Sequence, residues 1–374
     1  MDPGRDVVVI GAGPAGCAAA IALKRLGVRS VLLLEAGDGT RPRFGESLPP
    51  DIGLILARLG LGEAFAALGF DPCVGAASSW GEARLGYNDF LFNPHGSGWH
   101  IDRARFDAFL RAQALAAGVD LRLRATLAEA GEDEAEEGVW LRVRSGGGVE
   151  TIRAGIALDA TGRAARLARA LGAERIEGDR LVCVGGLVSL GPNARLGQRS
   201  LLEAVDYGWW YAARLTVDEA IVVVATDADL LRERRLHRLD AWRAHLDQTL
   251  HVAAALGPAA PSSGLMMRQA RSSRLSRAGG RRWRAIGDAA SVYDPIMAQG
   301  VTKAMLEGVS IAPDIKRALA GAGLASDAGL EARFSDYLTL RDHFYAQEGR
   351  WPGAPFWSRR RRPQPVSQAR EVLA

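Results

Sequence analysis

The sequence predicts an α/β fold in which a Rossmann-like, dinucleotide-binding domain is interrupted by a mostly antiparallel β domain. Three observations lead to this prediction. A strand of buried-type residues runs directly into Gly11-Ala12-Gly13-Pro14-Ala15-Gly16. Midway along the chain, another predicted strand delivers the turn Asp159-Ala160-Thr161-Gly162. After a long β-rich stretch, the α/β pattern resumes at Arg284-Ala285-Ile286-Gly287-Asp288. Sequence-distant segments are therefore expected to form one domain around one ligand.

The N-terminal turn has the full context of a phosphate-binding fingerprint. Residues 6–10 form the strand before it, and an Ala-rich helix is predicted over residues 17–26. A second apolar run, residues 30–34, then ends in Glu35. Strand, glycine turn, helix, strand and acidic residue make a complete βαβ unit, which is far more specific than an isolated G-x-G-x-x-G.

Each residue of this fingerprint has a predicted physical role. Gly11 permits the tight turn, Gly13 lets the backbone approach a pyrophosphate, and Gly16 lets the helix pack closely on the strand. The helix N-terminus at Ala15 directs backbone N–H groups and a positive dipole end at the phosphates. Glu35 would accept a hydrogen bond from a ribose hydroxyl. The sequence therefore predicts a dinucleotide site here.

The remaining elements follow from periodicity and turn signals. Helices are predicted over residues 51–68, from Asp102 as N-cap to Gly118, over residues 239–256, and from about Gly300. Strands are predicted over residues 120–124, 139–144, 149–158, 181–190, 208–215 and 220–225. The dinucleotide domain would then comprise residues 1–69, 101–178 and 281–351, with the β-rich substrate domain at residues 70–100 and 179–280. Residues 352–374 form a Pro- and Arg-rich tail that is expected to be poorly ordered.

Composition narrows the function classes. The net charge is +4 and the pI about 9.2, but part of the excess is the run of arginines at residues 359–362, which is typical of a solvated face and does not predict nucleic-acid binding. Three scattered cysteines without C-x-x-C spacing indicate a reducing compartment, and the histidines show no metal-ligand spacing. The sequence therefore does not predict a metal site. It contains no apolar run long enough for a membrane span and no signal peptide, so it predicts a cytoplasmic protein without a membrane partner.

The turn at Gly287-Asp288 is the second strong signal. An Asp at the end of a strand can accept hydrogen bonds from a ribityl chain. The following loop through Gln299 to Gly300 would bring a helix N-terminus close to a flavin pyrimidine ring, where the dipole stabilises negative charge on the reduced ring. A helix-capping Asp beside an ordinary turn is the alternative for this segment alone.

The glycine fingerprint, the Asp159–Gly162 turn and Gly287-Asp288 together resemble the FAD-dependent group that includes p-hydroxybenzoate hydroxylase, geranylgeranyl reductases and flavin-dependent halogenases. The segment beginning Asp102-Arg103 fits too, since that group places an arginine there against the FAD. The resemblance implies a p-hydroxybenzoate hydroxylase-like fold with FAD at the domain boundary. It makes the following residues cofactor-binding candidates: Gly11, Gly13, Ala15, Gly16, Glu35, Arg43, Ser47, Arg103, Asp159, Gly162, Gly287, Asp288, Gln299 and Gly300.

A narrower resemblance rests on four segments in order: Phe44-Gly45-Glu46-Ser47-Leu48-Pro49-Pro50, Gly98-Trp99-His100-Ile101-Asp102-Arg103, Gly208-Trp209-Trp210-Tyr211 and Arg350-Trp351-Pro352. They are similar to the flavoproteins that mature lysine ε-oxidase, glycine oxidase and quinohemoprotein amine dehydrogenase. That resemblance implies an FAD-dependent monooxygenase that hydroxylates a tryptophan of a partner protein or peptide during tryptophylquinone cofactor biogenesis. It would need O2 and an external reductant, either NAD(P)H or a separate reductase.

Two alternatives stay open. One is a flavin-dependent tailoring hydroxylase or halogenase acting on a small natural product, and the other is a non-enzymatic flavoprotein scaffold that escorts a partner polypeptide. Tryptophan halogenases resemble this chain but need a lysine near the substrate, and no lysine occurs between Lys24 and Lys303. Lys303 would lie on the helix after the flavin-binding turn.

The reacting groups are predicted least sharply. Glu46, His100 and Asp294 are the candidate catalytic side chains near the flavin ring, with loop hydrogen bonding or capping as the alternative for each. Trp209 and Tyr211 alternate on a predicted strand, so they would share one face and line the substrate cavity. Aromatic residues of a strand also commonly belong to a core.

Overall fold

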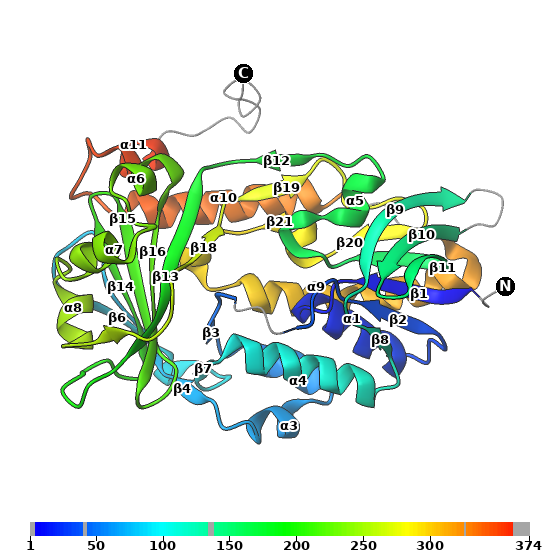
Figure 1. Ribbon diagram of the computed structural model, residues 1–374, viewed down its shortest axis with the longest axis horizontal. Helices are drawn as coiled ribbons and strands as arrows, with labels where there is room; N and C mark the ends of the chain where they lie inside the picture. The colour runs from blue at the N-terminus through cyan, green and yellow to red at the C-terminus, as the bar shows by residue number, and fades with distance from the viewer. Residues whose placement is uncertain (1–3, 40–42, 134–137, 325–326, 362–374) are drawn as a thin grey trace.

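The computed structural model describes residues 4–39, 43–133, 138–324 and 327–361. Figure 1 shows two sheet-containing parts at opposite ends of the long axis, with α9 (Gly300–Arg317) extending from the middle beneath the right-hand part and α10 (Leu330–Ala346) along the upper side. The chain enters each part more than once, as the alternating α/β and β-rich segments predict. The predicted fold class, an FAD-type α/β domain interrupted by an antiparallel sheet, is confirmed.

The first sheet has the strand order β8-β2-β1-β11-β10-β9, with β20 beside β11. β8, β2, β1, β11 and β20 run parallel, whereas β9 and β10 form an antiparallel extension. The parallel strands therefore end at one edge, where ligands bind in open α/β sheets. Their bounds are β1 (Arg5–Ile10), β2 (Val31–Leu34), β8 (Asp120–Arg122), β9 (Thr126–Asp133), β10 (Gly138–Ser145), β11 (Gly148–Asp159) and β20 (Trp283–Ala285).

Three helices cover one side of this sheet. α1 (Pro14–Arg25) is buried along almost its whole length and packs against α9 and α4 (Arg103–Ala116). The contact between α1 and α9 depends on Gly308, because a Cβ there would lie 2.4 Å from the carbonyl oxygen of Ala15. The Asp102 side chain accepts a hydrogen bond from Arg105 N at 3.0 Å, which confirms the predicted N-cap of α4.

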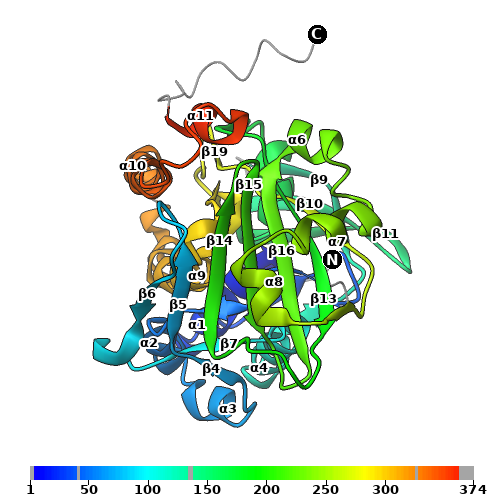
Figure 2. The ribbon, with the colours of Figure 1, turned by 90° about the vertical axis from the view of Figure 1, so that its left-hand side faces the viewer.

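The second sheet has the order β17-β13-β16-β15-β14-β5-β6, with β18 beside β13. Trp210 on one face packs against Trp242 of α7 (Leu239–Leu246), and Figure 2 shows α7 and α8 (His251–Leu256) over that face with α1 and α9 behind the sheet. The strands are β5 (Gly75–Ser79), β6 (Gly86–Asp89), β13 (Leu181–Ser189), β14 (Arg199–Val205), β15 (Gly208–Arg214), β16 (Glu219–Asp227), β17 (Ala260–Pro261) and β18 (Met266–Gln269).

Two small sheets and several short helices join the parts. β7 (Gly98–His100) pairs with both β3 (Ser47–Leu48) and β4 (Asp71–Cys73), and β19 (Ser273–Leu275) pairs with β12 (Arg175–Glu177) and β21 (Ser291–Val292). The other α-helices are α2 (Ile52–Arg58), α3 (Gly62–Ala66), α5 (Arg166–Ala170), α6 (Ala228–Glu233) and α11 (Pro355–Arg361).

Several predicted elements needed correction. The helix predicted over residues 51–68 is broken into α2 and α3 at Gly60, whose φ of +69° does not continue a helix. The helix predicted over residues 239–256 is likewise divided into α7 and α8. Neither β9 nor β14 was predicted. β10 and β11 form a hairpin through residues 145–148, with Ser145 paired to Gly148.

The tail was expected to be poorly ordered from residue 352, and this is wrong for residues 352–361. α11 buries Phe356 and Trp357 almost completely, and both belong to the hydrophobic core of the second sheet together with Tyr345 of α10. Arg359 and Arg360 form ion pairs with Asp227, so this part of the arginine run is not a solvated face. Residues 362–374 lie outside the described residues.

Candidate cofactor and active site

Gly11 and Gly13 are glycines for different reasons. Gly11 has a φ of +106°, and a Cβ there would meet Ala160 O at 2.3 Å, so the turn itself requires glycine. Gly13 has an ordinary φ of −83°. A Cβ at Gly13 would meet only the Arg43 guanidinium, at 3.4 Å. Since nothing in the protein requires glycine at residue 13, the bare backbone fits an external group that approaches closely.

Backbone donors and a carboxylate lie beside this turn. No side chain caps the N-terminus of α1, which leaves its first N–H groups available to an anion. Glu35, just after β2, accepts hydrogen bonds from Ala12 N at 2.9 Å and from Gly37 N at 3.1 Å. The predicted phosphate and ribose groups are thus adjacent. This arrangement fits the ADP portion of a dinucleotide.

Arg103 holds the loop before β3 onto α4. Its guanidinium donates to Phe44 O at 2.6 Å and pairs with Asp107 at 3.3 Å. Arg43 approaches the same Asp107 at 3.9 Å, with its own side chain largely exposed. The loop containing two predicted cofactor contacts, Arg43 and Ser47, is therefore fixed beside the α1 turn, and Arg103 acts on the loop as well as facing the predicted cofactor.

The second turn is held together by the side chain of Asp159. Asp159 is completely buried, and its carboxylate accepts hydrogen bonds from Thr161 N, Thr161 Oγ1 and Ala168 N. The carboxylate of Asp159 therefore shapes the turn, and its contact with FAD stays a prediction. Gly162, at a φ of +65°, is only half-buried and remains a candidate.

The third turn is braced from α9. Lys303 Nζ donates to Gly287 O at 3.1 Å and to Ser291 O at 2.9 Å, while Glu307 accepts from Gly287 N at 2.6 Å. Asp288 is half-buried, and its carbonyl oxygen accepts from Arg175. The loop thus holds the Asp288 side chain at the carboxyl edge of the sheet, where the predicted ribityl chain would lie.

The N-terminus of α9 is the most open part of the site. Gln299 is the N-cap residue without a side-chain hydrogen bond, and both Gln299 and Gly300 are exposed. Ala298, just before them, has a left-handed φ of +50°, an uncommon conformation for a residue with a Cβ. The loop therefore presents uncapped N–H groups to solvent instead of covering them.

Glu46 and Asp294 are two buried carboxyls whose charges both influence one buried thiol. Burial raises the pKa of Glu46 to about 7 and that of Asp294 to about 6. Burial also raises the pKa of Cys183 on β13, and the negative charges of Asp294 and Glu46 raise it further. Burial thus brings the pKa of both predicted catalytic carboxyls close to neutrality, the range in which general acids and bases work.

His100, Ser47 and Tyr211 are joined by a residue that the sequence analysis missed. Ser200 Oγ lies 3.2 Å from His100 Nε2 and 2.9 Å from Ser47 Oγ, which lies 2.7 Å from the Tyr211 hydroxyl. Burial lowers the pKa of His100 to about 4, so its ring is neutral at physiological pH. A serine in a strand carries no sequence signal, and only the register of β14 reveals Ser200.

Trp209 does not line an open cavity. It shares a face of β15 with Tyr211, as predicted, but only 3% of its surface is exposed. Its indole Nε1 donates to the Tyr345 hydroxyl at 3.1 Å. The prediction of a substrate-lining Trp209 is corrected to a buried packing residue, whereas the half-buried Tyr211 stays a candidate.

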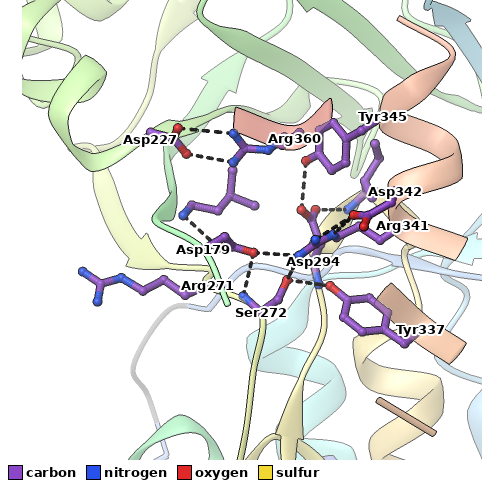
Figure 3. A network of polar contacts seen from close by, with 12 residues as sticks. Asp179, Asp227, Arg271, Ser272, Asp294, Tyr337, Arg341, Asp342, Tyr345 and Arg360 are labelled. Atoms are coloured by element: carbon purple, nitrogen blue, oxygen red, sulfur yellow. Dashed lines mark hydrogen bonds and ion pairs between the residues drawn. The ribbon is translucent and has the colours of Figure 1, made fainter. Parts of the chain in front are cut away.

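Asp294 belongs to a buried polar network that Figure 3 shows in close-up. Its carboxylate caps the short helix after it by accepting from Ile296 N at 3.0 Å, and it accepts from the Tyr345 hydroxyl at 2.8 Å. Its backbone N donates to the Tyr337 hydroxyl at 2.6 Å. Asp294 is therefore held by two tyrosines of α10, although capping alone would explain an Asp at this position.

Among the described residues, no helix combines the length and apolarity that a membrane crossing requires. The same residues contain no cluster of three or more His, Cys, Asp or Glu side chains suited to a metal ion. All three lysine amines of the chain donate to backbone carbonyl groups: Lys24 to Arg29, Lys316 to Leu26, and Lys303 as above.

A family model described as an FAD-binding domain matches residues 5–333. The chain belongs to this FAD-binding family. Its bare glycine at residue 13, uncapped helix N-termini and flanking carboxylates fit the cofactor that the family binds. Consistent with this, the chain is 32% identical over 359 residues to LodB of Marinomonas mediterranea, named as a putative FAD-dependent oxidoreductase; the match covers 95% of this chain and 96% of LodB.

Flavin-dependent halogenases recur among the other similar proteins. One from Armillaria mellea is 27% identical over 84% of this chain and 68% of its own length. The crystal structure of the halogenase CmlS superposes with a TM-score of 0.86 at 26% identity, covering 98% of this chain and 69% of CmlS. QhpG, a peptidyl tryptophan dihydroxylase essential for tryptophylquinone cofactor biogenesis, shares the fold at 24% identity and a TM-score of 0.66, over 96% of this chain and 79% of its own. The protein is thus an FAD-dependent oxidoreductase.

Proposed function

We propose that this protein is an FAD-dependent tailoring enzyme that hydroxylates an electron-rich aromatic ring of a small natural product, using O2 and an external reductant. The observation that carries the proposal is the buried carboxyl of Glu46, which lies on the loop that Arg103 fixes beside the α1 turn and whose pKa burial raises to about 7. The halogenase relatives support a small-molecule aromatic substrate over a protein partner.

The residues of the chain would bind and orient, while the cofactor would supply the oxidation. The chemistry that FAD would supply when bound and reduced is the activation of O2 for transfer to an electron-rich carbon. Gly13, Glu35 and the N-terminus of α1 would hold the ADP portion, and Asp288 the ribityl chain. The uncapped N-terminus of α9 would stabilise negative charge. Glu46, neutral below about pH 7, would hold or release a proton at its carboxyl group as the ring is attacked.

The lysines favour hydroxylation over halogenation. A halogenase that works through a lysine amine needs that amine free near the substrate. Lys303 is the one lysine on an element of this site, and its Nζ is already held by two carbonyl oxygens, with the side chain only 10% exposed. Halogenation therefore remains the alternative within the same substrate class.

A second candidate is hydroxylation of a tryptophan in a partner peptide or protein. It is supported by the four sequence segments that resemble tryptophylquinone-maturing flavoproteins and by the shared fold with QhpG over nearly the whole chain. A flavoprotein that only escorts a partner is the non-enzymatic form of this candidate.

Product analysis tests these functions against each other. Purified protein is incubated with FAD, a flavin reductase with NADH, air and bromide, together with simple phenols, indole and a tryptophan-containing peptide. Gain of one oxygen atom on a phenol or indole supports the proposal, and a bromine isotope doublet supports halogenation instead. Oxygen gained by the peptide alone supports the second candidate. Reoxidation without any modified product, in protein that retains FAD, would overturn the enzymatic proposals.

A further inference from the structure

Three side chains form a hydrogen-bonded chain whose direction is fixed. An indole N–H can only donate, so Trp209 donates to the Tyr345 oxygen at 3.1 Å. The hydroxyl proton of Tyr345 is then free to point the other way, to Asp294 Oδ2 at 2.8 Å. Ile296 N donates to Asp294 Oδ1 at 3.0 Å. Both carboxylate oxygens therefore receive a hydrogen bond.

These donors oppose a strong tendency of Asp294 to become neutral. The residue is only 2% exposed, and burial together with the charge of Asp179 raises its pKa to about 6. Hydrogen bonds donated to a carboxylate favour its charged form. Arg341 of α10 and Arg360 of α11 act in the same direction as these donors, by charge.

The other groups that face Asp294 are occupied. Arg341 is shared with Asp179 and Asp342, and Arg360 is held by Asp227 through two of its nitrogens. Tyr337 receives the backbone N–H of Asp294 and contacts Ser272, and burial raises the pKa of Tyr337 itself. The thiol of Cys183 is kept neutral because burial raises its pKa. Among the described residues, Tyr345 is the side chain that donates a hydrogen bond to the carboxylate of Asp294.

We propose that Tyr345, oriented by Trp209, is a positioning residue that holds Asp294 as a carboxylate in the loop leading to the N-terminus of α9. The proposal rests on the proposed function and deepens it. The negative charge of Asp294, in the loop before α9, would depend on Tyr345 of α10 and Trp209 of β15. Its physical content, the ionisation of Asp294, does not require any particular substrate.

Removal of one hydroxyl tests it. Tyr345→Phe leaves Oδ2 without a donor, and a hydrogen bond to a charged group is strong enough for the pKa of Asp294 to rise by roughly one to two units. Because the folded pKa of Asp294 exceeds that of the unfolded chain, the contribution of Asp294 to stability declines as pH rises toward the folded value and is then level. In Tyr345→Phe this decline should extend to correspondingly higher pH.

Tyr337→Phe is the matched control. Tyr337 lies on the same helix, is also buried, and touches the same residue, but it contacts the backbone N–H instead of the carboxylate. Loss of the Tyr337 hydroxyl should lower stability by a similar amount at every pH, without shifting the pH range over which stability declines. With Asp294→Asn in the background, wild-type Tyr345 and the Tyr345→Phe change should show no pH-dependent difference, because no carboxylate remains to titrate.

The experiment measures unfolding of the full-length protein in urea from mildly acidic to mildly alkaline pH, with FAD retained in one series and removed in a second. The proposal is supported if the decline in unfolding free energy moves to higher pH in Tyr345→Phe and moves by a smaller amount in Trp209→Phe. Parallel curves for wild type, Tyr345→Phe and Tyr337→Phe would overturn it. If Tyr345→Phe does not fold, an unshifted decline in Trp209→Phe overturns it as well. Absence of product formation alone would contradict only the proposed function.

Discussion

Gly11 is required by the fold, whereas Gly13 is a glycine that we expect to be required by the ligand. Its backbone conformation is open to any residue, and only a flexible arginine tip lies where a side chain would project. Gly13→Val is therefore expected to fold normally but to lose FAD affinity by roughly tenfold or more, because the methyl groups would occupy the space of the pyrophosphate. FAD content after purification and quenching of flavin fluorescence on titration measure this.

Gly62→Val provides the control for that change. A Cβ at Gly62 would meet nothing within 4 Å, and a Cβ at Gly13 would meet only the tip of Arg43. Gly62, however, begins α3, away from the α1 turn. The control should retain wild-type FAD. Equal FAD content in Gly13→Val and the control would show that the fingerprint is not the pyrophosphate site.

His100 gives the protein a calculable sensitivity to acid. Its folded pKa of about 4 lies below the ordinary value of 6.5, so the unfolded chain takes up a proton first as pH falls. The contribution of His100 to stability should therefore be constant above pH 6.5 and decrease as pH falls from 6.5 to about 4, by at most about 3 kcal/mol. In urea unfolding, His100→Gln should reduce this loss of stability toward acidic pH. His237→Gln, at an exposed position, should not. An unchanged acid slope in His100→Gln would contradict the assignment.

At the residue scale, sequence patterns located the groups whose roles depend on neighbours along the chain. Gly16 and the Asp102 cap act on groups within a few residues, so a local pattern identifies them. Ser200 and Tyr345 were missed because their partners lie far away in sequence, and the burial of Asp159 was not foreseen because a buried and an exposed Asp at a strand end look alike. Burial and register, which decide these roles, are properties of the assembled fold.

At the scale of elements, the crossing of α1 and α9 explains why a glycine lies within a long helix. Gly308→Ala should raise intrinsic helix propensity by about 1 kcal/mol. We nevertheless expect a net destabilisation of roughly 1–3 kcal/mol, since its Cβ would lie 2.4 Å from Ala15 O and 2.9 Å from Ala19 N. Thermal unfolding measures this, and FAD retention should fall as the two helix N-termini separate.

Gly53→Ala in α2 is the matched helix control. Its Cβ would make an ordinary contact with Trp99, at 3.7 Å, so propensity should dominate and stability should stay level or rise. A Gly308→Ala variant as stable as this control would mean that the helices can move apart freely.

Elements were predictable where side-chain patterns were strong. β1, α4 and α9 combine apolar periodicity with clear ends, and they were predicted. β9 is largely exposed or half-buried with only Leu127 buried, so its alternation is weak. α11 was hidden inside a Pro- and Arg-rich stretch, since the burial of Phe356 and Trp357 depends on a sheet formed by residues much earlier in the chain.

At the scale of the whole molecule, α11 fastens the end of the described chain to both the second sheet and the cofactor loop. Arg360, 7% exposed at its side chain, binds Asp227 of β16 through two nitrogens. Its guanidinium also stacks over Tyr345, whose hydroxyl reaches Asp294. One buried cation thus connects the C-terminal helices, the antiparallel sheet and the loop before α9.

Arg360→Met should therefore lower both global stability and FAD retention. The loss of a buried partner leaves Asp227 with only Arg359, for which a destabilisation of roughly 3–5 kcal/mol is expected. The double variant Asp227→Asn with Arg360→Met should recover part of the lost stability. The cost of Arg360→Met comes mainly from the buried Asp227 carboxylate that loses its partner, and Asn carries no charge. Restored stability without restored FAD affinity would show that Arg360 supports the cofactor loop through Tyr345, separately from its ion pair. Additive losses in urea unfolding would instead mean that the two residues act independently and that no such connection exists.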